Sequence, residues 1–205
     1  MSSHEIVGIF PTPILIKEFS RNFTQKELAF LKKYSSDTID NVGNTRTRQS
    51  YILEEDVLSD IKKECLNTLD LYIKNIYNPE NELTPYITQS WLNYTKEKQY
   101  HHLHTHQNSF ISGILYIDAD PANDSVSFYR NNLNNFIRIY PKEFNHFNNE
   151  SMRFSVKSGL IIIFPSNLTH SVEEKNGNNT RISLAFNSMF KGKIGLEYAT
   201  NELIL

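Results

Sequence analysis

Short stretches of β-forming residues, separated by residues that favour turns, fill the chain from about Thr84 to Phe190. The separating segments are rich in Asn, Asp, Pro and Gly, which end strands for different stereochemical reasons. Many short strands with frequent turns are typical of a β-sandwich or a β-barrel. The stretches that predict strands are Tyr86–Tyr94, Phe110–Asp118, Ser125–Arg130, Met152–Val156, Leu160–Phe164 and Arg181–Phe190.

The first third of the chain is predicted to be mainly helical. Thr24 and Glu27 have the spacing of a capping box at a helix N-terminus. A longer helix is predicted from Glu54 to Tyr77, because apolar side chains recur there at steps of three and four. We expect this row to pack against a sheet, with Cys65 as a buried small apolar residue rather than a nucleophile. The row consists of Leu58, Ile61, Cys65, Leu69, Tyr72 and Ile76.

Length and composition limit the organisation of the chain and its partners. We expect one domain over residues 1–205, with a helical part at about 20–80 and a β core at about 84–190. The formal net charge is −2, from 21 Lys and Arg against 23 Asp and Glu, so no nucleic-acid-binding surface is indicated. No membrane span and no signal peptide are apparent, and we therefore expect a cytoplasmic protein. The single cysteine excludes an internal disulfide and a cysteine-rich zinc site.

Four histidines lie within six residues, at positions 101, 102, 104 and 106. Side chains alternate between the two faces of an extended strand, so His102, His104 and His106 could point the same way. Two imidazoles at positions i and i+2 could then hold one metal ion. Either His104 with His106 or His102 with His104 could be that pair, and a histidine-rich surface tract without a function is the alternative.

A third metal ligand must come from elsewhere in the chain, and His170 is the best placed candidate. It follows an apolar predicted strand, Gly159–Phe164, and a turn that contains Pro165. His4 lies in a terminal segment, and His146 lies in the Asn-rich interval 131–149. That interval could be a lid or a substrate loop, or else an ordinary surface insertion.

The strand predicted after His170 carries a row of polar and small side chains on one face. Arg181, Ser183, Ala185 and Asn187 alternate with apolar residues, as expected for a pocket wall. A guanidinium binds a carboxylate through two hydrogen bonds, and the Ser183 hydroxyl could add a third. Tyr116, on the strand after the histidine cluster, could supply a phenolic donor. The row therefore indicates a carboxylate-binding site, and a surface ion pair of Arg181 is the alternative.

These motifs, in this order, resemble the 2-oxoglutarate-Fe(II) oxygenases. Within that superfamily the chain looks closest to a family found in phages and marine bacteria that is related to the prolyl hydroxylases. The resemblance covers most of the chain, and each motif is weak alone whereas the ordered set is fairly specific. The similar segments are Ile9–Pro13, Trp91–Asn93, His104–Tyr116, Phe164–His170 and Arg181–Asn187.

The resemblance implies a double-stranded β-helix, or jelly roll, that binds one Fe(II) and uses 2-oxoglutarate and O₂. His104, His106 and His170 would be the metal ligands, and Arg181 would hold the distal carboxylate of 2-oxoglutarate, helped by Ser183 and Tyr116. The implied reaction is hydroxylation of a C–H bond. The substrate would be a protein, a peptide or an amino acid, by analogy with prolyl hydroxylases, and a phage-encoded enzyme would act in the host cytoplasm.

One departure from the superfamily pattern affects the metal chemistry. Most members have His-x-Asp or His-x-Glu where this chain has His104-Thr105-His106. Three neutral imidazoles leave the metal more positive than two imidazoles and one carboxylate do. Two other functions therefore stay open: a cupin-like three-histidine metalloenzyme without 2-oxoglutarate, and a non-catalytic jelly roll with an interaction or structural role.

Overall fold

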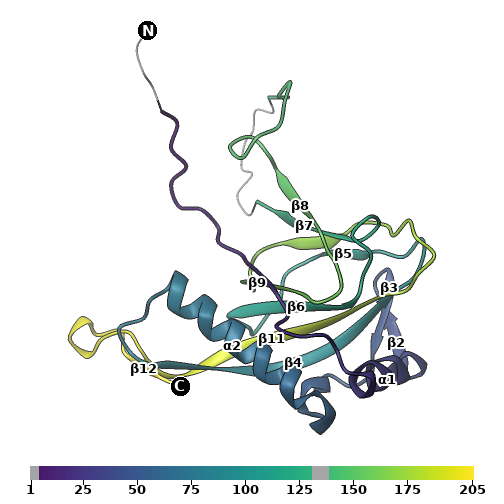
Figure 1. Cartoon of the computed structure of the whole chain (residues 1–205). Helices are drawn as coiled ribbons and strands as arrows, with labels where there is room; N and C mark the ends of the chain where they lie inside the picture. The colour runs from purple at the N-terminus through teal and green to yellow at the C-terminus, as the bar shows by residue number, and fades with distance from the viewer. Residues whose placement is uncertain (1–4, 131–138) are drawn as a thin grey trace.

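Antiparallel strands dominate the computed structural model, which describes residues 5–130 and 139–205 (Figure 1). They form a larger and a smaller sheet, and the predicted jelly-roll class is confirmed. Residues 131–138, the first part of the Asn-rich interval and of the expected lid or substrate loop, lie outside the described residues. Within the described residues, no helix combines the length and the apolar composition needed to cross a membrane.

The larger sheet has the strand order β1-β9-β6-β11-β4-β3-β2, and β12 pairs with β11. Its two long strands, β4 and β11, pair with each other over most of their length. The predicted strands appear within a few residues of their expected bounds, whereas β1, β2, β3 and β12 were not predicted. The bounds are β1 Leu15–Glu18, β2 Thr38–Asn41, β3 Asn44–Thr47, β4 Leu83–Thr95, β6 Ile111–Asp118, β9 Leu160–Pro165, β11 Arg181–Ile194 and β12 Leu203–Ile204.

The smaller sheet has the order β5-β10-β7-β8 and faces the larger one. Its central strand β10 is short, and it pairs with both β5 and β7. This arrangement brings two parts of the sequence together, because His170 on β10 is the register partner of His104 on β5. The bounds are β5 His101–His104, β7 Ser125–Tyr129, β8 Ser151–Ser155 and β10 His170–Val172.

The helical prediction for residues 20–80 is wrong in part, because two strands and three short 3-10 helices, the first at Tyr34–Ser36, interrupt that region. The β2–β3 hairpin turns at Gly43, whose φ of +88° favours glycine. The long helix α2 begins at Ser59 rather than Glu54 and ends at Ile76. The preceding 3-10 turns, Ile52–Glu54 and Asp56–Leu58, are tied to the sheet, since the Leu53 N–H donates to Ser90 Oγ at 2.9 Å.

The two helices are held as their sequence patterns predict. Helix α1, Gln25–Lys33, has the full capping box between Thr24 and Glu27. Helix α2 packs its apolar row against the larger sheet (Figure 1), except for Ile76 at its last residue, which is exposed, contrary to the prediction. Cys65 in that row is completely buried, and burial raises the pKa of its thiol, so the prediction that it is not a nucleophile is consistent with its surroundings.

Alternation along the strands separates the two faces of the larger sheet. On β11, Ile182, Leu184 and Phe186 belong to the apolar core beneath α2. The residues between them face the smaller sheet instead. The strand therefore carries a packed face and a polar face, and the polar face contains the row that begins at Arg181.

Gly113 on β6 allows the Phe186 ring of β11 to pack directly on the backbone. A Cβ atom at this position would overlap the Phe186 ring and crowd Ile163. We expect Gly113→Ala to lower the free energy of unfolding by about 1–3 kcal/mol, the usual cost of overpacking a core. Urea denaturation measures this change, with Gly8→Ala as a control, because a Cβ at Gly8 has only an ordinary contact with Phe147. Equal stability of the two variants would contradict the expectation.

Candidate functional site

Three histidines, at the end of β5, just beyond it and at the start of β10, converge between the two sheets. His104 ends β5, His106 follows two residues later, and His170 begins β10. One nitrogen of each ring lies within 4.8 Å of a nitrogen of each other ring, close enough to share one metal ion. His170 is only 2% exposed. The structure thus brings together the three residues that the sequence motifs singled out.

Each of these three imidazoles has its Nδ1 paired with an oxygen acceptor outside the cluster. His104 Nδ1 lies 2.7 Å from the carbonyl oxygen of His102, and His170 Nδ1 lies 3.0 Å from that of Leu168. His106 Nδ1 pairs with Oδ1 of Asn187. An oxygen acceptor requires a proton on Nδ1, so Nε2 of each neutral ring carries the lone pair that can bind a metal. Such hydrogen bonds are the usual means of orienting histidine ligands.

The electrostatic surroundings keep these rings neutral. Burial, with a contribution from the neighbouring imidazoles, lowers the pKa of His170 to about 3. Burial likewise lowers the pKa of His104 to about 4 and shifts the pKa of His106 downwards. Metal binding requires unprotonated imidazole, and the cluster therefore stays competent well below neutral pH.

The lowered pKa of His170 predicts that acid weakens the metal-free fold. Unfolded His170 takes up a proton below about pH 6.5, whereas the folded residue does so only near pH 3. Between these values the unfolded state binds more protons, so stability falls as the pH falls, by up to about 1.4 kcal/mol per pH unit for this residue. Denaturant unfolding of the metal-free protein at pH 7, 6 and 5 measures the slope. A slope that is the same in His170→Phe would contradict this assignment.

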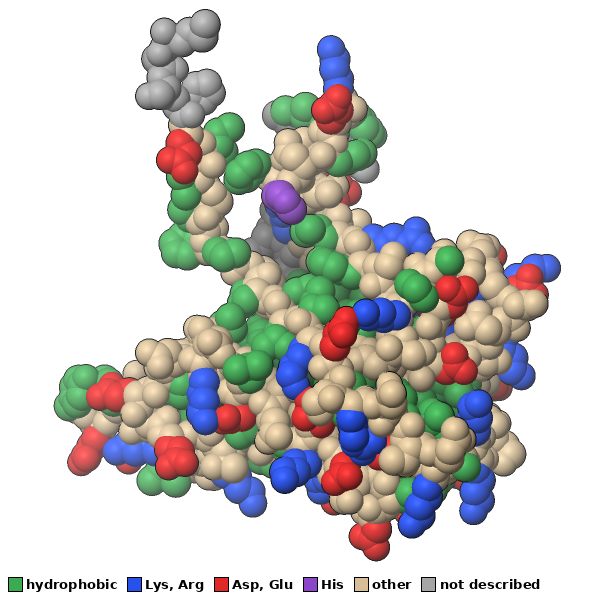
Figure 2. Space-filling model, viewed as in Figure 1, with side chains coloured by type: hydrophobic (Ala, Val, Ile, Leu, Met, Phe, Trp, Pro, Cys, Tyr) green, Lys and Arg blue, Asp and Glu red, His purple; other side chains and the backbone are tan. Residues whose placement is uncertain are grey.

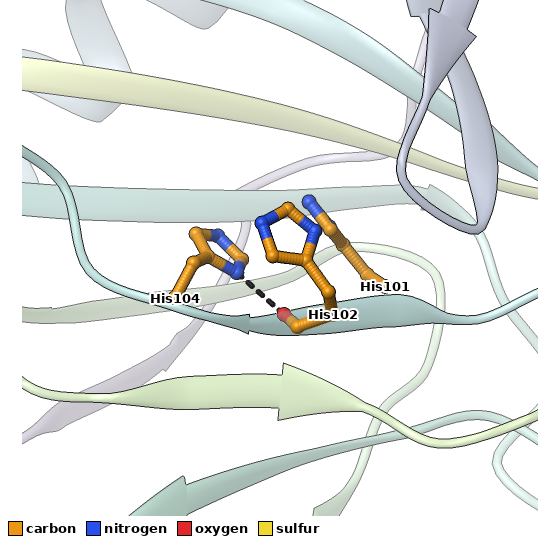
Figure 3. A group of neighbouring side chains, drawn as sticks. All are labelled: His101, His102 and His104. Carbon is orange, nitrogen blue, oxygen red and sulfur yellow. Dashed lines mark hydrogen bonds between the residues drawn. The ribbon is translucent and has the colours of Figure 1, made fainter.

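A second group of histidines, His101, His102 and His104, also lies within metal-binding distance (Figure 3). Its rings are less well oriented, because no hydrogen bond in the described residues reaches His102 Nδ1, whereas the Nδ1 atoms of His104, His106 and His170 are all paired. His101 Nε2 already faces the Asn41 side-chain amide at 3.3 Å. His104 belongs to both groups but has only one free nitrogen. The geometry therefore favours His104 with His106 and His170.

A pocket extends from the three histidines along the polar face of β11. Its wall includes a row of residues on neighbouring strands, in which Ser183 lies opposite Tyr116 on one side and Asn93 on the other. Asn93 is 5% exposed, and its Oδ1 has no hydrogen-bond partner among the described residues. Buried polar atoms normally have a hydrogen-bond partner, so this unpaired oxygen in the pocket indicates a place where a polar ligand can bind.

Arg181 lies in this pocket and is only 3% exposed. Its Nη2 donates to Thr95 Oγ1 at 3.0 Å, and its Nη1 lies 3.7 Å from Asp124 Oδ1. Burial lowers the pKa of the guanidinium, but arginine side chains remain protonated in proteins. Burial also raises the pKa of Tyr116, whose neutral hydroxyl can donate a hydrogen bond. The six predicted site residues are therefore grouped around one pocket.

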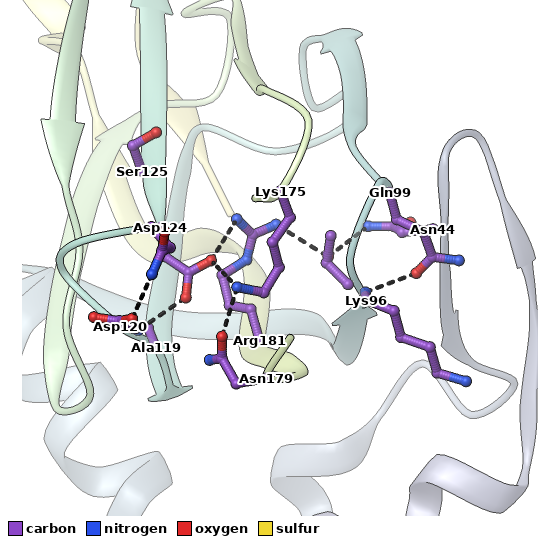
Figure 4. A network of polar contacts seen from close by, with 12 residues as sticks. Asn44, Lys96, Gln99, Ala119, Asp120, Asp124, Ser125, Lys175, Asn179 and Arg181 are labelled. Atoms are coloured by element: carbon purple, nitrogen blue, oxygen red, sulfur yellow. Dashed lines mark hydrogen bonds and ion pairs between the residues drawn. The ribbon is translucent and has the colours of Figure 1, made fainter. Parts of the chain in front are cut away.

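The sequence analysis did not identify Asp124 or Lys175, which lie behind Arg181 (Figure 4). Both are buried in spite of their charges. Lys175 occurs in the charged segment Glu173–Asn176, which has the composition of a solvated turn. No local signal in the sequence distinguishes this lysine from a surface residue. Thr95 and Asn93 could have been found from their positions, since both precede the turn that leads to the histidines.

The donor set fits a divalent transition metal such as Fe(II). Three neutral imidazoles with fixed orientation would offer three nitrogen ligands, so that other ligands could also bind the ion. In the part of the chain that the structure describes, no carboxylate joins either histidine group. The centre thus differs from the 2-His-1-carboxylate arrangement, and it keeps the full charge of the ion until an anionic ligand binds.

The segment that carries these residues matches a known protein family. A family model described as "Putative 2OG-Fe(II) oxygenase" matches residues 89–187, a segment that contains all six predicted site residues. Over this segment the chain is similar to the 2OG-Fe(II) oxygenases. No curated protein matches the sequence significantly. The family resemblance inferred from the motifs is thereby confirmed, and 2-oxoglutarate, Fe(II) and O₂ are the reactants that this family uses.

Solved oxygenases share the fold at low sequence identity. HygX from Streptomyces hygroscopicus, solved with nickel, 2-oxoglutarate and hygromycin B, is 12% identical, with 86% of this chain and 82% of HygX covered and a TM-score of 0.58. A prolyl-4-hydroxylase from Pseudomonas putida is 12% identical, with 86% and 92% covered and a TM-score of 0.54. The epimerase SnoN is 10% identical, with 87% and 78% covered and a TM-score of 0.59.

Proposed function

We propose that this oxygenase binds Fe(II) through His104, His106 and His170 and hydroxylates a C–H bond of a peptide or amino-acid substrate. The observation that carries the proposal is the joint position of three oriented imidazoles and a buried arginine in one pocket. A metal-chelating ligand with a distal carboxylate needs both features. 2-Oxoglutarate is such a ligand.

Arg181 is the proposed partner of the distal carboxylate of 2-oxoglutarate. The guanidinium has a neutral hydroxyl acceptor in Thr95 and only a distant carboxylate in Asp124, so its charge is available to a ligand. Ser183 and Tyr116, adjacent on paired strands, add hydroxyl donors to the same carboxylate. These donors are preorganised by burial, which limits the entropy lost when the ligand binds.

When bound by His104, His106 and His170, the metal would supply the oxidation chemistry, by which a substrate C–H bond, O₂ and 2-oxoglutarate would yield a C–OH group, succinate and CO₂. The protein residues orient the reactants and exclude water. His106 is held for this role by the Asn187 amide and by its backbone N–H, which donates to the Ser166 carbonyl at 2.9 Å. Phe164 and Phe128 pack against His170 and shield it from solvent on that side.

An apolar groove supports a peptide as the substrate. The groove runs between the N-terminal segment and the β7–β8 pair, where Figure 2 shows apolar side chains in a hollow. Phe128 and Leu168 line it, and both contact His170, through ring packing and through the Leu168 carbonyl. The groove therefore ends one side chain away from the proposed metal ligands. The fold shared with a prolyl-4-hydroxylase also favours this substrate class.

A three-histidine metalloenzyme without 2-oxoglutarate is the second candidate, favoured by the third imidazole in place of a carboxylate. Succinate formation separates the two. Purified protein loaded anaerobically with Fe(II) is given 2-oxoglutarate and air without a substrate, and slow uncoupled turnover is expected. Metal-dependent oxidation without any need for 2-oxoglutarate would favour the second candidate. Peptide libraries, followed by mass spectrometry for a gain of one oxygen atom, then test the substrate class.

A further inference from the structure

Two buried cations share one buried carboxylate behind the proposed 2-oxoglutarate pocket (Figure 4). Lys175 is 1% exposed, Asp124 is 2% exposed and Arg181 is 3% exposed. Buried charges are normally paired, since an isolated charge in a low-dielectric interior is strongly unfavourable. This group has one positive charge more than its single carboxylate can balance.

The distances show which cation Asp124 balances. Its Oδ1 lies 3.1 Å from Lys175 Nζ but 3.7 Å from Arg181 Nη1. No hydrogen bond of good geometry reaches this oxygen in the described residues, so both contacts are ion pairs. The other oxygen, Oδ2, accepts the Asp120 N–H at 2.8 Å. Asp124 thus pairs more closely with Lys175 than with Arg181. The positive charge of Arg181 is therefore left largely uncompensated.

Lys175 is fixed in this position by contacts that do not involve the pocket. Its Nζ also donates to Asn179 Oδ1 at 2.8 Å. Its backbone N–H donates to the Gln99 carbonyl, and its carbonyl accepts the Lys98 N–H, both at 2.9 Å. Neither Lys175 nor Asp124 lines the pocket, whereas Arg181 does. Lys175 therefore has no contact through which it could hold a ligand directly.

We infer that Lys175 is a positioning residue. Because it forms an ion pair with Asp124, Asp124 does not pair fully with Arg181, and the guanidinium can bind the carboxylate of the ligand. The inference rests on the proposed function, since that carboxylate belongs to 2-oxoglutarate. Without Lys175, Asp124 would be the only buried carboxylate beside a buried guanidinium. A carboxylate and a guanidinium form a strong two-point hydrogen-bonded pair, so Arg181 would turn to Asp124 and its charge would be neutralised.

The first variant is Lys175→Met, which removes the charge and keeps a side chain of similar length. Isothermal titration of 2-oxoglutarate into the Ni²⁺-loaded protein measures the affinity without turnover. We expect at least about a tenfold loss, the usual effect of removing a hydrogen bond to a charged group. 2-Oxobutyrate serves as the control ligand, because it has the same keto acid end but lacks the distal carboxylate. Its affinity should be unchanged, which also shows that the metal site is folded.

The double variant Lys175→Met with Asp124→Asn is the decisive test. Removing the Asp124 charge leaves Arg181 without a competing carboxylate, so the affinity for 2-oxoglutarate should return to within about threefold of the original value. A merely structural role for Lys175 predicts no recovery, because the second substitution removes a further buried contact. Recovery in the double variant is therefore not explained by general loss of stability.

The outcomes separate this inference from the proposed function. If the original protein binds no 2-oxoglutarate, the proposed function fails and the inference fails with it. If the original protein binds 2-oxoglutarate and Lys175→Met binds it equally well, only the inference is overturned. Equal losses for 2-oxoglutarate and 2-oxobutyrate, or a double variant no better than the single one, would also overturn it.

Discussion

Substitution of His170 by alanine is expected to lower the affinity for Fe(II) by about a hundredfold or more and to reduce succinate formation to background. Loss of an orienting group near a metal ligand already costs up to about a hundredfold, and loss of the ligand itself costs at least as much. His170 is buried between the sheets, and its Nε2 faces His104 and His106. Competition with a chromogenic chelator under anaerobic conditions measures the affinity.

Two histidine variants serve as controls for this experiment. His146→Ala removes an exposed histidine away from both histidine groups, and it should leave metal binding unchanged. His102→Ala tests the second group and should also leave binding nearly unchanged. If His102→Ala were the damaging variant and His170→Ala the harmless one, the metal would belong to His101, His102 and His104 instead.

Arg181→Ala is expected to weaken 2-oxoglutarate binding by about 10- to 100-fold while metal affinity stays the same. The guanidinium is the only pocket-lining cation with a permanent charge in the described residues, and hydrogen bonds to charged groups contribute about 1.5–3 kcal/mol. The substitution also leaves the Lys175–Asp124 pair balanced, since one cation then faces one carboxylate. The fold should therefore tolerate the change, which thermal unfolding can verify.

The matched control for Arg181→Ala is Arg153→Ala. Arg153 lies on β8, its side chain is 58% exposed, and it forms a surface ion pair with Glu173. Surface pairs contribute little, so neither stability nor 2-oxoglutarate affinity should change measurably. An Arg181→Ala protein that still consumed 2-oxoglutarate with its original KM would refute the role proposed for Arg181.

The sequence predicts those parts of the fold in which the side chains on one face of a strand or helix are all apolar or all polar. The alternation along β11 places Arg181 and Ser183 on one face because Ile182 and Leu184 must enter the core. Helix α2 is predictable for the same reason, since its apolar row packs against one sheet. The histidines converge because β5 and β10 pair, and the order of the motifs indicated that pairing only through the family resemblance.

Other features depend on contacts that are distant in the sequence. The β2–β3 hairpin has two four-residue strands of mostly polar composition, and it forms because β3 adds to the edge of β4. Lys175 lies in a charged turn by composition, and only Asp124 from another part of the chain makes its burial tolerable. Pairwise charge balance of this kind leaves no periodic signal, so the sequence alone does not reveal it.

The third imidazole at the metal centre has a consequence for which ion the protein carries. Nitrogen-only sites follow the Irving–Williams order, in which Fe²⁺ binds more weakly than Ni²⁺, Cu²⁺ or Zn²⁺. A carboxylate would have offset part of this preference, but His106 stands where the superfamily pattern described above has one. The ion found after purification would then reflect which metals were available rather than which metal supports catalysis. An inactive preparation should therefore be stripped with a chelator and reloaded with Fe(II) before it is judged.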